Sequence, residues 1–239
     1  MKDDVYNPWH GCRKYSEGCL NCYVYRRDQS IGKDPSAVYR TASFDLPVRC
    51  SRNGSYKIPS GSHLFCCMTS DFFLPEADIW RDEVWNYINC RFDVDFTIIT
   101  KRIDRVRDCL PQNWGDGWEN VEICCTVESQ RQCDYRMPIF LCLPIRKKSV
   151  ICEPLLEDID FHDFLTEDIR QVSVGGESGD NARACDYSWV LNIRKQCQKS
   201  HVPFCFRQTG ANFIKDGRTY RLSRGDQLKQ ARKANIDIA

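Results

Sequence analysis

The stretch VEICCTVESQRQCDYRM (121–137) changes its pattern in the middle. Residues 121–127 are almost continuously apolar, which is typical of a strand buried on both faces. Residues 129–137 have helical spacing, and Ser129 stands where a helix N-cap is expected. The stretch therefore predicts a strand followed by a helix, with Glu128 at the turn between them.

The same order recurs along the chain, with strand-like apolar runs separated by stretches of helical spacing. The predicted strands are 63–70, 96–100, 121–127, 148–152, 170–176 and 203–208, and the predicted helices are 80–89, 103–110, 129–137 and 187–199. Because a parallel crossover needs about a dozen residues and usually takes a helix, this alternation predicts an α/β fold with a parallel sheet. A β/α barrel and an open doubly wound sheet both remain possible.

Polar residues follow each predicted strand. They are Ser70-Asp71, Thr100-Lys101-Arg102, Thr126-Val127-Glu128, Glu153-Pro154, Gly176-Glu177-Ser178 and Arg207-Gln208. In a parallel barrel these carboxyl ends meet on one face, where such folds place their active sites. Charged residues also follow strands simply because loops are wet, so the set carries more weight than any one member.

The composition excludes a few classes of protein. The chain has 239 residues and a formal charge of +1, so no overall field selects nucleic acid or an anionic membrane. Residues 211–239 are locally biased, with seven basic residues against three aspartates, which fits either a solvated surface or a contact with a polyanion. Since no apolar run of membrane-spanning length and no signal peptide is present, we expect a soluble cytoplasmic protein.

The sixteen cysteines fall into two groups. Pairs such as Cys66-Cys67 and Cys124-Cys125 lie inside apolar runs, and we expect most cysteines to be reduced, buried fillers. Cys12, Cys19 and Cys22 instead lie together in the polar loop HGCRKYSEGCLNC (10–22). Three thiolates at this spacing suit an iron-sulfur cluster, or a structural zinc ion with His10 as the fourth ligand. A loop without metal is the third alternative.

Three cysteine ligands would leave one iron of a four-iron cluster open. The amino and carboxylate groups of S-adenosylmethionine can chelate such an iron, and electron transfer into the sulfonium splits a carbon-sulfur bond. The protein would then position the cofactor and exclude competing reactions.

Several ordered motifs extend beyond the cysteines. They are Asn7-Pro8, His10-Gly11-Cys12, Ser16-x-Gly18-Cys19-x2-Cys22-Tyr23, Trp80 to Trp85, Thr100-Lys101-Arg102, Thr126 to Gln130, Cys152 to Leu156, Gly175 to Gly179, Val202-Pro203-Phe204 and Arg207-Gln208. Together they resemble the phage-associated three-cysteine-motif family of unknown function, which is usually placed with the radical S-adenosylmethionine superfamily.

The resemblance implies a partial or near-complete TIM-like β/α barrel over residues 1–210, with an N-terminal cluster-binding loop. It also implies a [4Fe-4S] cluster on Cys12, Cys19 and Cys22, with S-adenosylmethionine across the strand ends. Residues 211–239 would form a basic C-terminal extension packed on or trailing the same domain. The resemblance names no substrate.

Nine strand-end residues are the remaining candidates. Ser70 and Asp71 could bind the methionine amino group, and Glu128 the ribose hydroxyls. Lys101 could hold the cofactor carboxylate or an anionic substrate. Glu153, Gly175, Gly176, Glu177 and Ser178 are predicted to line the cofactor or substrate site, and Lys101 and Glu177 are the candidate catalytic residues. Helix capping, structural salt bridges and ordinary tight turns are the competing interpretations.

The sequence therefore predicts a radical S-adenosylmethionine enzyme supplied with electrons by a donor such as flavodoxin or ferredoxin. A nucleic-acid base or nucleotide is one expected substrate class, and a peptide or small metabolite is another. The rival hypothesis is a non-enzymatic Cys3His zinc module that binds nucleic acid or a protein.

Overall fold

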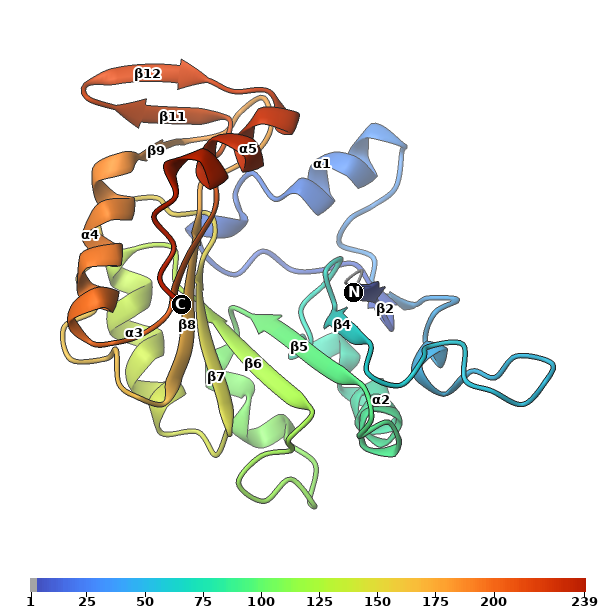
Figure 1. The fold of residues 1–239 in the computed structure, drawn as a ribbon. Coiled ribbons are helices and arrows are strands. Elements are labelled where there is room, and N and C mark those ends of the chain that lie inside the picture. Colours follow the sequence, from blue (N-terminus) through green and yellow to red (C-terminus); the bar gives the residue numbers. More distant parts are fainter. Residues whose placement is uncertain (1–3) are drawn as a thin grey trace. The chain divides into compact units, whose positions relative to one another are not determined.

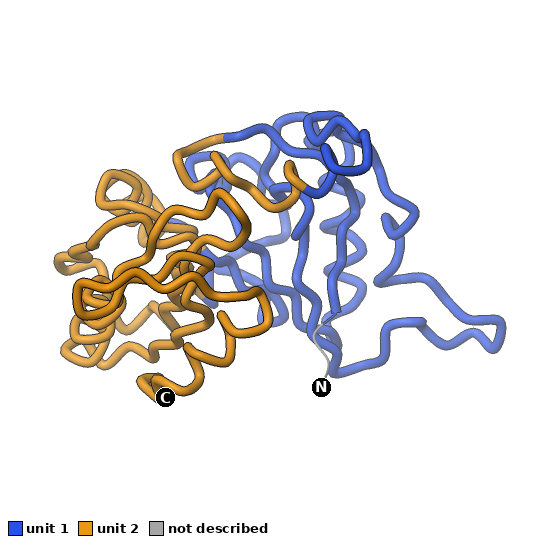
Figure 2. Tube along the Cα trace, turned by 90° about the horizontal axis from the view of Figure 1, so that it is seen from above, with its two compact units in different colours: residues 1–14, 27–124, 143–147 blue, residues 15–26, 125–142, 148–239 orange. Residues whose placement is uncertain are grey.

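The computed structural model describes residues 4–239, and this part of the chain divides into two compact units (Figure 2). The first unit comprises the residues up to Lys14, Arg27–Cys124 and Leu143–Lys147. The second comprises Tyr15–Arg26, Cys125–Cys142 and Lys148–Ala239. The boundary divides the cysteine loop, so that Cys12 belongs to the first unit and Cys19 and Cys22 belong to the second.

The fold is mixed α/β with a seven-stranded sheet in the order β1-β4-β5-β6-β7-β8-β10. Its strands are β1 (Asp4–Tyr6), β4 (His63–Cys66), β5 (Asp95–Thr100), β6 (Val121–Thr126), β7 (Lys147–Cys152), β8 (Ile169–Gly175) and β10 (Phe204–Gln208). The pairs β1-β4, β4-β5, β7-β8 and β8-β10 are parallel. Since β1 and β10 end the strand order, the sheet is consistent with a partial β/α barrel.

In the first unit, the sheet strands are accompanied by helix α2 (Asp78–Cys90). Trp85 of α2 is fully buried and packs edge-on against the ring of Phe72. The ring of Trp114 also contacts Trp85, at 5.3 Å between ring centroids. Two short strands, β2 (Trp9–His10) and β3 (Tyr39–Arg40), pair antiparallel. The 3-10 turns η2 (Leu46–Val48) and η3 (Pro75–Ala77) contact α2.

In the second unit, α3 (Gln130–Leu141) and α4 (Tyr187–Lys199) lie on the same side of β7 and β8 (Figure 1). Helix α5 (Arg224–Ala234) packs against β10. A second sheet has the order β12-β11-β9, formed by β12 (Arg218–Arg221), β11 (Asn212–Lys215) and β9 (Ala184–Asp186). The basic C-terminal residues therefore form a hairpin and a helix of this unit.

All six predicted strands are present, and the predicted helices 80–89, 129–137 and 187–199 correspond to α2, α3 and α4. Strand β4 is shorter than the apolar run 63–70, because Cys67 has a φ of 58° that an extended strand cannot continue. The predicted α-helix 103–110 is wrong. Two 3-10 turns, η4 (Ile103–Arg105) and η5 (Arg107–Cys109), take its place, since so short a segment before Pro111 gains little from α-helical propagation.

The expectation that most cysteines are buried is confirmed, because nine of the sixteen are buried, among them Cys66, Cys67, Cys124 and Cys125. Burial also raises the pKa of the Cys185 thiol to about 12, so this thiol is protonated and unreactive near neutral pH.

No helix within residues 4–239 is both long enough and apolar enough to cross a membrane.

Candidate functional site

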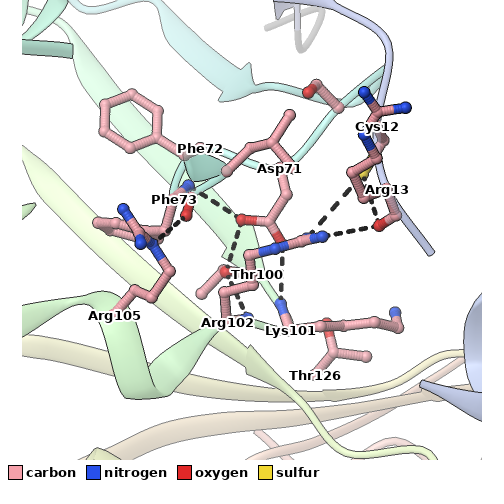
Figure 3. Close-up of polar contacts among 12 residues, drawn as sticks. Cys12, Arg13, Asp71, Phe72, Phe73, Thr100, Lys101, Arg102, Arg105 and Thr126 are labelled. Carbon is pink, nitrogen blue, oxygen red and sulfur yellow. Dashed lines mark hydrogen bonds and ion pairs between the residues drawn. The ribbon is translucent and has the colours of Figure 1, made fainter. Parts of the chain in front are cut away.

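Asp71 organises the polar cluster at the carboxyl ends of β4 and β5 in the first unit (Figure 3). One carboxylate oxygen accepts hydrogen bonds from the Phe73 amide at 2.9 Å and the Thr100 hydroxyl at 2.8 Å. The other accepts from the Lys101 amide at 3.2 Å and lies 3.1 Å from the Arg102 guanidinium. Four donors match the acceptor capacity of a carboxylate. In the structure, the Asp71 carboxylate therefore binds neighbouring residues of the same chain, and its contact with a cofactor stays a prediction.

Cys12 is held beside this cluster. The Arg102 guanidinium donates to the Arg13 carbonyl at 2.7 Å and lies 4.0 Å from the Cys12 sulfur (Figure 3). The Ser70 hydroxyl donates to the Gly11 carbonyl. The segments after β4 and β5 thus fix the backbone on either side of Cys12.

The His10 ring is paired with the carboxylate of Asp28. The His10 Nε2 atom lies 2.5 Å from a carboxylate oxygen of Asp28, and both side chains are buried. The His10 ring also packs against Tyr39 at 5.4 Å between centroids. This pair explains His10 as a structural residue, but a carboxylate also orients many zinc-binding histidines, so the pair by itself does not separate the two hypotheses.

In the second unit, Glu128 holds the segment that carries Cys19. Glu128 is completely buried and accepts a hydrogen bond from the Ser16 hydroxyl. Its other oxygen lies 2.7 Å from the guanidinium of Arg136, which is also completely buried. A Cβ atom on Gly18 would lie 2.9 Å from Glu128, so only glycine lets the loop approach this closely.

A second set of contacts fixes the neighbouring residue Glu17. Its carboxylate accepts from the Ser129 hydroxyl and from the Gln132 amide at 3.0 Å, and its carbonyl accepts from Arg183 at 2.9 Å. Burial opposes ionisation of Glu17, but the hydrogen bonds outweigh it and the pKa is lowered. Ser129 also accepts from the Gln132 backbone amide, as its expected role as the N-cap of α3 requires.

Glu177 binds Arg183 in a bidentate arrangement. The guanidinium lies 2.6 Å from one carboxylate oxygen and 3.0 Å from the other, and Asn21 donates to the second oxygen at 2.9 Å. Burial opposes the charge, but the hydrogen bonds from Arg183 and Asn21 outweigh it and lower the pKa of Glu177. Glu177 is therefore a carboxylate near neutral pH that ties the Asn21 segment to the end of β8.

The glycines predicted near the cofactor are required by packing within the chain. A Cβ on Gly175 would lie 2.9 Å from both Glu153 and Gln208, and one on Gly176 would lie 2.3 Å from the Thr209 carbonyl oxygen. Glu153 itself receives a hydrogen bond from Gln208 at 3.3 Å.

Ser178 is also engaged with the cysteine-bearing part of the second unit. Its carbonyl accepts a hydrogen bond from Arg26 of α1 (Tyr23–Ser30) at 2.8 Å. This contact joins the loop after β8 to the helix that follows Cys22.

Lys101 differs from the other candidates, because its ammonium group forms no ion pair or hydrogen bond with the residues that the structure describes. Only its backbone amide contributes to the Asp71 cluster. A half-buried cation of this kind can bind an anionic ligand without first breaking a contact within the protein.

The three loop cysteines are partly exposed, whereas nine others are buried. Cys19 ends the turn η1 (Glu17–Cys19), and Cys22 directly precedes α1. In the described part of the chain, no three His, Cys, Asp or Glu side chains gather as they would around one metal ion. The donor chemistry of three accessible thiols suits an iron-sulfur cluster, whose ligands bind separate irons. Cluster and zinc ion both stay predictions.

The sequence singled out the strand-end residues but not their partners. Arg26 gives no local signal, because it lies 152 residues from Ser178. Arg136 lies eight residues from Glu128 and Arg183 lies six from Glu177, but neither spacing is the three or four residues that marks an ion pair along a helix. A buried glutamate needs a cation, yet which of the 34 basic residues supplies it depends on the fold.

Comparison with known proteins gives one match. No curated protein and no solved structure matches the chain. The family described as protein of unknown function (DUF5131) matches residues 1–235, nearly the whole length. The chain therefore belongs to the DUF5131 family of proteins of unknown function.

Proposed function

We propose that this protein is a radical S-adenosylmethionine enzyme whose [4Fe-4S] cluster is held by Cys12, Cys19 and Cys22. The observation that carries the proposal is the attachment of the cysteine loop to strand ends. In the first unit, Ser70 and Arg102 bind the backbone next to Cys12. In the second unit, Glu128 binds Ser16, three residues before Cys19, and Glu177 binds Asn21, next to Cys22.

This attachment favours a cluster-binding loop over a loop that only covers the sheet. Each anchor lies beside a cysteine that is partly exposed, and two of the anchors are buried charged pairs. Buried charges are costly to maintain, so a protein that needs only to cover its sheet gains nothing by using them. A loop that must hold three thiols in a fixed arrangement gains rigidity from buried charged pairs.

When bound, such a cluster would leave one iron for the amino and carboxylate groups of S-adenosylmethionine, and after reduction by an electron donor it would supply the electron that cleaves the cofactor to methionine and a 5′-deoxyadenosyl radical. The chain contributes the rest. The Arg102 guanidinium would place a positive charge beside the Cys12 sulfur, and the Lys101 ammonium group would be available for the cofactor carboxylate or for an anionic substrate. We place Glu153, Gly175, Gly176 and Ser178 near the ligand as a further part of the proposal.

An electron donor such as flavodoxin or ferredoxin would be required, which fits a cytoplasmic protein. The alternative remains a Cys3His zinc module in which His10 supplies the fourth ligand. The buried His10–Asp28 pair is the specific observation that keeps this alternative open.

Anaerobic purification and iron-sulfur reconstitution test the proposal. We expect a brown protein that forms 5′-deoxyadenosine from S-adenosylmethionine when a reductant is added. Cys12→Ser, Cys19→Ser and Cys22→Ser should each lose the cluster and the cleavage. Matched controls are Cys50→Ser, Cys90→Ser and Cys142→Ser, which change exposed cysteines elsewhere and should keep both.

The zinc hypothesis makes a different prediction for His10. If His10→Gln loses metal as completely as Cys19→Ser while Asp28→Asn retains it, His10 is a ligand and the radical enzyme is excluded. Asp28→Asn is the necessary control, because it disturbs the buried pair without removing a candidate ligand. A colourless zinc protein that cleaves no S-adenosylmethionine after reconstitution would also exclude the radical enzyme.

A further inference from the structure

The hairpin formed by β11 and β12 presents an exposed strand at the edge of the second unit's smaller sheet. Every residue of β12 is exposed, and β12 is the edge strand of the sheet β12-β11-β9 (Figure 1). The turn consists of Asp216 and Gly217, both with positive φ, which is the tight two-residue connection that fits the twist of a hairpin. The hairpin is therefore a defined structural element rather than an irregular loop.

One face of the hairpin carries two cations directly opposite each other. Lys215 of β11 and Arg218 of β12 are cross-strand partners, and both are exposed. Like charges in this position destabilise a sheet. Neither side chain forms an ion pair with a carboxylate in residues 4–239, including that of Asp216 in the turn between them. An anion bound between the two side chains would relieve this repulsion.

Aromatic rings lie beside these cations. Tyr220 is two residues from Arg218 along β12, so both side chains are on the same face, and the Tyr220 side chain is 45% exposed. The Lys215 ammonium lies 5.3 Å from the ring centroid of Tyr187, which packs on Phe213 at 5.7 Å. A cation-π contact thus fixes one cation, while the Tyr220 ring stays accessible.

We propose that the face formed by Lys215, Arg218 and Tyr220, the hairpin patch, binds single-stranded nucleic acid. Lys215 and Arg218 would contact backbone phosphates, and the Tyr220 ring would stack on an unpaired base. Paired cations next to an exposed aromatic ring are the combination that single-strand binding proteins use. An anionic membrane requires only the cations, and an acidic peptide has no bases to stack on Tyr220.

Protection of a sheet edge is the competing explanation for basic residues on β12. It accounts for Arg218 and Arg221, which are on the edge strand. β11 pairs with β9 only from Asn212 to Ile214, so edge protection also covers Lys215. It gives no reason for an exposed tyrosine between Arg218 and Arg221.

Fluorescence anisotropy with a labelled oligothymidylate of about 20 nucleotides tests the proposal on the full chain. The protein is used without S-adenosylmethionine or reductant, so the result is independent of the proposed radical chemistry. Two phosphate contacts should weaken binding about sevenfold between roughly 50 mM and 200 mM salt, because each contact contributes about 0.7 to the logarithmic slope. Lys215→Gln/Arg218→Gln should remove this dependence.

The matched control is Lys195→Gln/Lys199→Gln on α4, which removes the same charge from exposed positions outside the hairpin. It should bind as the unchanged protein does. Tyr220→Ala should weaken binding about fivefold to 150-fold, the equivalent of one stacked base, whereas Tyr220→Phe should retain it.

Three results would overturn the proposal. They are the absence of binding at the lower salt concentration, an equal loss in the α4 control, and unchanged affinity of Tyr220→Ala together with equal binding of duplex DNA or anionic vesicles. The last result would identify a general attraction for polyanions. All variants change exposed side chains, and circular dichroism verifies that they are folded.

Discussion

Asp71 and Glu128 are buried carboxylates that anchor the cysteine loop, and their negative charges are compensated in different ways. In the first unit, the charge of Asp71 is compensated by Arg102 and by three neutral donors, two of which are backbone amides. In the second unit, Glu128 depends on Arg136 and the Ser16 hydroxyl. Arg136 in turn leaves its Nε and one terminal nitrogen without a hydrogen-bond partner among the described residues.

This difference predicts how sensitive each anchor is to the substitution of one residue. A carboxylate that is shared among several donors keeps most of its compensation when one donor is lost. A fully buried pair that consists almost entirely of one glutamate and one arginine loses its compensation at once. The Glu128–Arg136 pair should therefore tolerate substitution least.

The largest effect is expected for Glu128→Gln, which leaves the buried Arg136 without a counter-charge. We expect a loss of roughly 3–5 kcal/mol in the free energy of unfolding, measured by urea denaturation. Replacing both partners in Glu128→Leu/Arg136→Met should recover a large part of this loss, because no buried charge then remains. If the double variant is as unstable as the sum of the single variants, the pair does not act as a unit.

The next effect concerns the close approach of the loop to Glu128. Gly18→Ala places a Cβ within 2.9–3.0 Å of three Glu128 atoms and should cost about 1–3 kcal/mol. Trypsin should then cut faster after Arg13 and Lys14, as detected by mass spectrometry. Gly225→Ala is the control, because its Cβ meets nothing closer than 4.0 Å and its helical position favours alanine.

A comparable or smaller effect is expected when the distributed anchor is changed. Asp71→Asn removes the counter-charge of Arg102 but keeps an acceptor for neighbouring donors, so the loss should be about 1.5–3 kcal/mol. The comparison with Glu128→Gln in the same urea experiment is the decisive measurement. A larger loss for Asp71→Asn would show that the number of donors does not protect this site.

The smallest effect is a change in pH dependence. The pKa of Glu177 is lowered from its usual value of 4.5, because the bonds to Arg183 and Asn21 outweigh the cost of burial. Its contribution to stability is therefore complete above about pH 4.5 and is lost as the pH falls through the lowered pKa. Glu177→Gln should show a shallower loss of stability below pH 5 than the unchanged protein. Identical slopes for the two proteins would contradict this role.

The sequence allowed prediction of the elements with strong local patterns. The six apolar runs became strands, and α2, α3 and α4 followed from helical spacing. Strands β1, β2, β3, β9, β11 and β12 and helices α1 and α5 were missed. These strands have only two to four residues, and both helices are strongly polar, so tertiary packing rather than periodicity stabilises them.

The sequence by itself determined the parallel α/β character of the fold and the separation of Cys12, Cys19 and Cys22 from the buried cysteines, because hydrophobic pattern and local polarity are properties of neighbouring residues. Tertiary structure alone decided which side chains meet. Glu128 lies eight residues from Arg136 but 112 from Ser16, and Glu177 binds Asn21 across 156 residues. Such pairing depends on how the strands are brought together, since charge and hydrogen bonding act through space and not along the chain.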